Sequence, residues 1–126
     1  MVDNVALSAR KKDTEADNMK YRVEVVEDVY TVVGSDVLLG TAWDLNNADN
    51  EMTKQDDGSY VLVKENVDLA TTGTYEYKVV KNRSWDWKGV NEGNNLTLTG
   101  VDVDGTYNVT FTLNKELNAL TASLEL

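Results

Sequence analysis

The sequence predicts an all-β fold, an immunoglobulin-like antiparallel β-sandwich. Short stretches of alternating apolar and polar residues recur along the chain, and clusters of Gly, Asn and Asp separate them. No stretch has a convincing helical period, and no internal repeat points to a solenoid or a propeller. The 126 residues suffice for one hydrophobic core. We expect residues 1–28 to form an extension, as a strand or a flexible arm, and residues 29–126 to form the sandwich.

The composition excludes several classes of function. The net charge is -10, with 22 acidic and 12 basic residues, so we expect neither a nucleic acid nor an anionic membrane as partner. There is no cysteine and no histidine, which excludes disulfides, thiolate chemistry and a serine–histidine triad within this chain. We expect no cofactor. No run is long and apolar enough to span a membrane, and we expect a secreted or cell-surface bacterial module whose signal segment is absent from this sequence.

The strands of the first half are separated by one long polar loop. Residues 21–25 alternate as a strand within the extension. The sandwich is expected to begin with a strand at 30–33, which ends at Gly34-Ser35-Asp36. Residues 44–57 are predicted to form the loop, closed by a hairpin turn at Asp57-Gly58. The next strand covers 60–64, and Val67 and Leu69 extend it.

The second half is organised around residues 74–87, TYEYKVVKNRSWDW. Residues 75–81 read as a half-buried strand, which a polar turn at 82–84 connects to two tryptophans. A loop rich in Gly and Asn follows over 88–95. Further strands are predicted at 96–99, 106–113 and 119–126, with a turn at Asp104-Gly105.

Several of these motifs resemble a known family when they are taken in order. They are VVGSDVLLGTAWD at 32–44, EYKVV at 76–80, SWD at 84–86, GNNLTLT at 93–99 and VTFT at 109–112. Together they resemble starch-binding modules, namely the α-glucan-binding-like module of pullulanases and amylopullulanases and carbohydrate-binding module family 20. The resemblance covers residues 29–126. It implies a non-catalytic module that holds starch-type α-glucans by stacking the apolar faces of the sugars on exposed aromatic rings, within a larger protein whose neighbouring domains are further candidate partners.

The resemblance also assigns ligand-binding residues, position by position. One or both tryptophans of the loop would stack on the sugar, a tyrosine after the long loop would add a second ring, and a lysine and two asparagines would bond to hydroxyl groups. These residues are Trp85, Trp87, Tyr60, Lys78, Asn94 and Asn95. The loop departs from the family patterns, since Gly93 stands where family 20 has a proline and Lys88-Gly89 replaces part of the pullulanase motif.

The aromatic residues allow two interpretations. Trp85 and Trp87 would share one face in an extended chain, either as an outward platform, which we favour, or as part of the core. Trp43 follows a predicted strand and is assigned to the core. If the tryptophans face inward, the chain is instead a structural spacer or protein-interaction module without a glycan site.

Two further functions are disfavoured. The loop over 44–51 has enough oxygen atoms for calcium but lacks the spacing of an EF-hand, so a solvated turn is the preferred interpretation. Asp86 and Glu92 could form a glycosidase-like carboxylate pair, yet 22 acidic residues in a small chain produce such pairs by chance. We therefore expect no catalytic activity.

Overall fold

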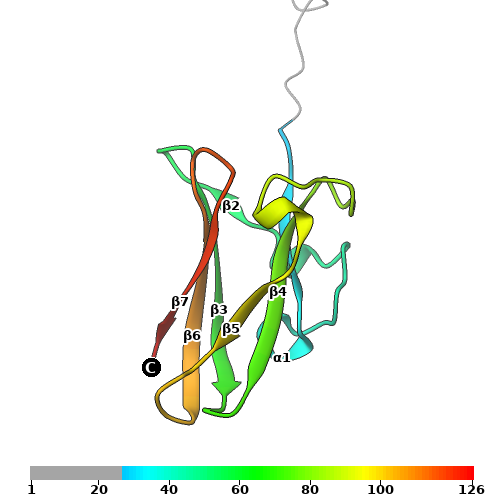
Figure 1. Cartoon of the computed structure of the whole chain (residues 1–126). Helices are drawn as coiled ribbons and strands as arrows, with labels where there is room; N and C mark the ends of the chain where they lie inside the picture. The colour runs from blue at the N-terminus through cyan, green and yellow to red at the C-terminus, as the bar shows by residue number, and fades with distance from the viewer. Residues whose placement is uncertain (1–26) are drawn as a thin grey trace, which may run out of the picture.

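The computed structural model describes residues 27–126, so the strand expected at 21–25 lies outside the described residues. Within them, the predicted all-β fold is confirmed: two antiparallel sheets face each other (Figure 1). The first sheet has the order β1-β4-β5 and the second has the order β2-β3-β6-β7. The strands are β1 (Tyr30–Gly34), β2 (Thr53–Lys54), β3 (Tyr60–Leu69), β4 (Thr74–Lys81), β5 (Leu96–Thr99), β6 (Gly105–Leu113) and β7 (Leu120–Glu125).

The two longest strands, β3 and β6, form the centre of the second sheet. They pair from Tyr60 opposite Leu113 to Leu69 opposite Gly105, with a register shift between Lys64 and Val67. Strand β3 therefore includes the predicted extension at Val67 and Leu69, and it bends where the shift occurs. On β6, four alternate residues are buried, as their alternation predicts. They are Tyr107, Val109, Phe111 and Leu113.

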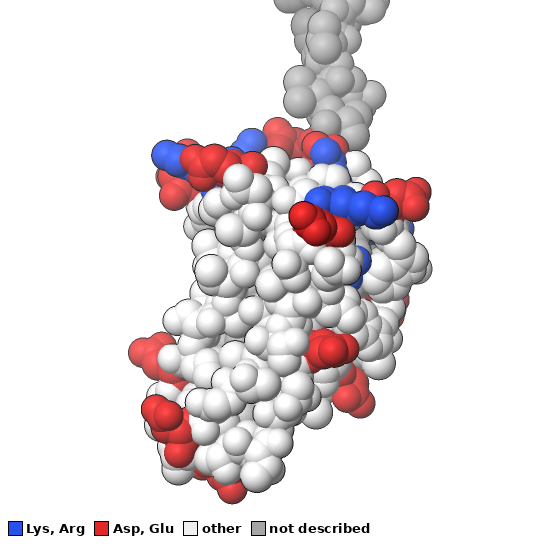
Figure 2. Space-filling model, viewed as in Figure 1, with Lys and Arg blue, Asp and Glu red and all other residues white. Residues whose placement is uncertain are grey.

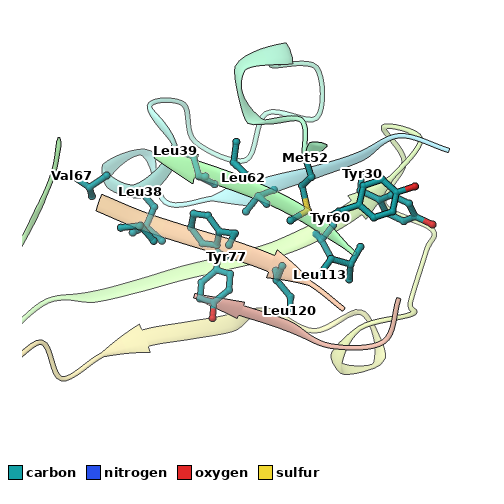
Figure 3. Close-up of a cluster of buried hydrophobic side chains, with 14 of the residues drawn as sticks. Tyr30, Leu38, Leu39, Met52, Tyr60, Leu62, Val67, Tyr77, Leu113 and Leu120 are labelled. Atoms are coloured by element: carbon teal, nitrogen blue, oxygen red, sulfur yellow. The ribbon is translucent and has the colours of Figure 1, made fainter. Parts of the chain in front are cut away.

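Aromatic and aliphatic side chains from both sheets fill the space between them (Figure 3). Near the middle, the ring of Tyr77 on β4 lies 5.3 Å from that of Phe111 on β6, centroid to centroid. At one end, the ring of Tyr30 on β1 lies 4.7 Å from that of Tyr60 on β3 in an edge-on arrangement. Both contacts join one sheet to the other, so these aromatic pairs contribute directly to the sheet-to-sheet packing.

One helical turn, α1 (Asp36–Leu39), follows β1, whereas the sequence analysis predicts no helix. Ser35 caps it, since its hydroxyl oxygen accepts a hydrogen bond from the backbone N–H of Val37. Gly40 ends it in the left-handed conformation at φ 80°. The turn directs Leu38 and Leu39 into the core, which explains the apolar run after the first strand. No helix of the described region is long and apolar enough to cross a membrane.

Strand β1 is buried along its whole length. The segment after α1, residues 41–52, lies along its free edge, where Glu51 pairs with Thr31, and we call it the covering segment. The predicted loop 44–57 is thus not simply a loop: it contains the short helix η2 (Ala48–Asn50) and strand β2. Asn50 is buried, and its amide donates to the carbonyl of Leu39 at 3.0 Å and accepts from the Lys64 ammonium at 2.8 Å. The N–H of Met52 donates to the carbonyl of Tyr30 at 2.8 Å. These bonds fix the covering segment against β1.

Candidate functional site

A tight turn at the end of β4 begins the loop that carries two tryptophans. Asn82 and Arg83 both have positive φ values, 54° and 57°, and the N–H of Ser84 donates to the carbonyl of Lys81 at 3.2 Å. Positive φ at both central residues is the mark of a type I′ hairpin turn, in which asparagine is favoured. The chain therefore reverses sharply here, as the polar residues 82–84 predict.

Side chains of the turn bind it to the rest of the upper end. The side-chain oxygen of Asn82 accepts from the backbone N–H of Val29 at 2.8 Å, and the side-chain amide nitrogen of Asn82 donates to the carboxylate of Asp28 at 3.0 Å. Arg83 forms an ion pair with Glu51 of the covering segment. This turn is therefore held from two sides, which restricts the positions that the following tryptophans can take.

The two tryptophans do not share a face, so that expectation is wrong. Trp85 is 46% exposed, whereas Trp87 is partly buried and packs against the core. The reason lies in the backbone: residues 82–86 form successive turns rather than an extended strand, so the alternation of side chains does not apply. Of the two, only Trp85 presents an exposed indole to a ligand.

Trp87 has a structural role. Its ring lies 5.4 Å from the ring of Tyr30, edge on, and Tyr30 in turn contacts Tyr60. On its other side lies Gly89, where an added Cβ would be 2.2 Å from the Cζ2 atom of Trp87. The indole therefore occupies a slot between Tyr30 and a backbone segment without a side chain, and it closes the upper end of the core.

Lys78 supports Trp85 from the outer face of the first sheet. Its ammonium lies 5.6 Å from the centroid of the Trp85 ring, within the range of a cation–π interaction. The same ammonium donates to the carbonyl of Gly93 at 2.8 Å. Lys78 thus connects the tryptophan turn to the loop that precedes β5. It holds the two loops together and also lies beside the indole of Trp85.

The loop before β5 presents the two predicted asparagines beside this lysine. Three successive residues there, Asn91, Glu92 and Gly93, have positive φ values of 49°, 55° and 83°. Such backbone costs about 1–3 kcal/mol for each residue other than glycine and persists only where the surroundings hold it. The Asn91 amide donates to the carbonyls of Asn94 and Asn95, at 3.4 and 3.2 Å. These bonds hold the loop backbone, and Asn94 and Asn95 are both exposed.

Glu76 also lies beside Lys78 and the two asparagines, although the sequence analysis did not identify it as a site residue. Asn95 precedes Leu96, which pairs with Tyr77, and its amide donates to the carboxylate of Glu76 at 3.4 Å. Glu76 and Lys78 alternate along β4 with the buried residues Tyr77 and Val79. The strand alternation could have identified Glu76, since a residue two positions before Lys78 shares its face.

Two aromatic residues lie elsewhere than expected. Tyr60 is only 8% exposed and packs on Tyr30 in the core, so its ring is not available as a second stacking surface. Trp43 is half-buried and lies outside the core cluster, so its assignment to the core is wrong. Its N–H donates to the carbonyl of Gly34 at 2.9 Å, which places Trp43 beside the end of β1.

The acidic residues of the described region form no group of three that could hold a metal ion. In the loop over 44–51, the polar side chains stabilise the backbone: Asp44 accepts from the N–H of Asn46, and Asn47 accepts from the N–H of Asp49, both at 2.9 Å. Asp86 and Glu92 are both exposed on the surface loops.

A comparison with known protein families shows to which family the chain belongs. Residues 22–120 match the family described as the pullulanase X25 domain. The chain belongs to this family. The resemblance to pullulanase-type modules that the motifs indicated is thereby confirmed, and the match begins within the predicted extension 1–28.

A solved structure agrees with this assignment. The X25 chain is similar to the pullulanase from Bacillus acidopullulyticus, with 26% sequence identity and a TM-score of 0.59. The similarity covers 80% of this chain and 12% of that enzyme, so the chain corresponds to one part of a much longer protein. No curated protein matches the sequence. The X25 domain is therefore related to an accessory module of a pullulanase.

The different packing of the two tryptophans predicts different effects on stability. Trp87→Ala should lower the free energy of unfolding by about 2–3 kcal/mol, because it leaves a cavity beside Tyr30. Trp85→Ala should change it by less than about 0.5 kcal/mol, as is usual for exposed positions. Urea unfolding followed by circular dichroism measures both values. Equal losses in the two variants would contradict the assigned roles.

The turn at Asn82 predicts an altered acidity of Asp28. The hydrogen bond from the Asn82 amide, with a smaller contribution from Lys81, lowers the pKa of Asp28 below the ordinary value of 3.8. A lowered pKa means that this bond stabilises the fold above pH 3.8 and that its effect is lost as the pH falls through the folded-state pKa.

Asn82→Ala should therefore raise the pKa of Asp28 toward 3.8. An NMR titration of the carboxyl carbon measures this change, with Asn118→Ala as a control in the turn between β6 and β7, where Asn118 bonds to Asn114. An unchanged Asp28 titration in Asn82→Ala would show that the turn does not hold the carboxylate.

Proposed function

We propose that this X25 domain is a non-catalytic module that binds starch-type α-glucans by stacking a sugar ring on Trp85. The observation that carries the proposal is the exposure of this indole, 46%, on a loop held by the turn at Asn82 and by Lys78. An aromatic ring that is exposed yet fixed loses little conformational entropy when a ligand binds.

The chemistry of the surroundings fits a sugar. Pyranose rings have apolar C–H faces, which pack on indole, and hydroxyl groups at their edges, which need hydrogen-bond partners. Glu76 shares the outer face of β4 with Lys78, and the amide of exposed Asn95 donates to its carboxylate. Asn94 adds a further exposed amide, next to Gly93, whose carbonyl accepts from Lys78. The combination of one fixed apolar plane with several polar neighbours suits a neutral polyhydroxyl ligand better than an ionic one.

The relationship to a pullulanase supports the ligand class, because that enzyme is named for an α-glucan. On this proposal the module keeps a larger secreted or cell-surface protein close to its polysaccharide. The competing proposal is a spacer or protein-interaction module, for which the sandwich is sufficient and the exposed tryptophan has no ligand. A direct binding measurement separates the two.

We predict that maltoheptaose and β-cyclodextrin bind and that cellohexaose does not, as measured by isothermal titration calorimetry. Trp85→Ala should weaken binding at least about tenfold, equivalent to about 1.4 kcal/mol, because the stacking surface is lost. The matched control is Val63→Ala, which removes a 49% exposed apolar side chain from the opposite sheet.

Lys78→Met tests the supporting residue, since it keeps the aliphatic stem and loses the bond to Gly93. We expect weaker binding with the fold intact. If the folded parent chain gives no heat with any of the sugars, the glycan proposal is wrong and the spacer proposal takes its place. Equal affinity in the parent chain and Trp85→Ala would instead contradict the assigned platform.

A further inference from the structure

The end of the sandwich opposite the tryptophan turn carries an apolar groove. Here β5 ends, the turn at 100–104 leads into β6, and β7 reaches the C-terminus (Figure 1). The groove has a volume of about 280 Å3 and is lined by residues 100–103, Tyr107, Leu124 and Leu126. Val103, within the turn, is 49% exposed, so apolar surface faces the solvent at this end.

Acidic residues surround the groove. Asp102, Asp104 and Glu125 flank it, and Asp36, Glu65 and Asp68 line two further hollows at the same end. Figure 2 shows acidic side chains and no basic ones at this lower end. The nearest lysine in the lining of these hollows is Lys64, whose ammonium already donates to Asn50. This end therefore has a negative field with an apolar centre, which suits a cationic and apolar ligand.

The chain itself contains a segment with the complementary composition. Residues 27–126 carry 17 acidic and seven basic side chains, so the net charge of -10 resides entirely there. Residues 2–12, VDNVALSARKK, contain Val2, Val5 and Leu7 and then three consecutive basic residues, Arg10, Lys11 and Lys12, against one acidic residue, Asp3, so their net charge is +2. This segment also lies outside the family match, which begins at residue 22, so it is not part of the shared module.

We propose that residues 2–12 bind to this groove within the same molecule. The three apolar side chains would cover Val103 and its neighbours, and the basic cluster would face Asp102, Asp104 and Glu125. The contacts join opposite charges around an apolar centre, which is the arrangement of a specific interface rather than of a purely electrostatic attraction.

The length of the chain permits this contact. The described part begins at residue 27, at the upper end of the sandwich (Figure 1). The ten residues of β3, which run along the sandwich, span about 33 Å at about 3.3 Å per residue. Residues 13–26 can extend to about 46 Å, so residues 2–12 can reach the lower end. The entropic cost of closing a loop grows only slowly with its length, so a connection of this length adds little to the cost of the contact.

Charge reversal in the full-length chain tests the proposal. In 15N-labelled protein, Arg10→Glu, Lys11→Glu and Lys12→Glu together should shift the amide signals of residues 100–104 and 124–126, because the segment is released from the groove. The matched control, Lys20→Glu with Arg22→Glu, reverses two charges in the connecting stretch and should leave those signals in place.

A second variant changes the groove instead of the segment, which provides an independent test. Val103→Lys places a positive charge in the exposed centre of the groove and should shift the signals of residues 2–12. Amide exchange at 100–104 should also become about fivefold or more faster in the triple variant, as expected for the loss of three exposed ion pairs. Superimposable spectra of the parent and the triple variant would overturn the proposal. Shifts that depend on protein concentration would also overturn it, because they would mean contact between molecules.

Discussion

The packing of Trp87 on Tyr30 is the contact on which the geometry of the candidate site depends. Tyr30 also contacts Tyr60 across the two sheets, so one aromatic row joins the loop after β4 to both halves of the sandwich. Since Trp87 is held inward by this row and the type I′ turn reverses the chain at Asn82 and Arg83, the residues between them project outward. The exposed indole of Trp85 is therefore a consequence of core packing.

The same upper end illustrates how polar side chains replace regular structure. Left-handed backbone at Asn82 and at Asn91 is held by hydrogen bonds from side chains, and Lys78 connects the two loops through the carbonyl of Gly93. A site built in this way keeps its shape without a ligand, which lowers the entropic cost of binding. The lower end differs: its groove is lined mainly by apolar residues, and acidic residues flank it.

The sequence predicts the strands well, because alternation is a direct consequence of a sheet with one buried face. It predicts the site less well, because loops do not follow a period. The spacing of Trp85 and Trp87 predicts a common face, yet successive turns separate them. Tyr60 was assigned by resemblance, and its burial depends on Tyr30, which is 30 residues distant in sequence. The position of Trp43 after a strand predicts a core residue, but its N–H donates to the carbonyl of Gly34, which holds it beside the end of β1.

The measurement that tests the central claim most directly uses the indole N–H signals of the three tryptophans in a 15N-labelled chain during titration with maltoheptaose. Trp85 is exposed and Trp87 packs on the core, so the signal of Trp85 should show a large saturable shift while that of Trp87 changes little. Trp43 reports on the edge of β1 in the same spectrum. A saturable shift confined to Trp87, or no shift of Trp85 at saturating sugar, would contradict the account.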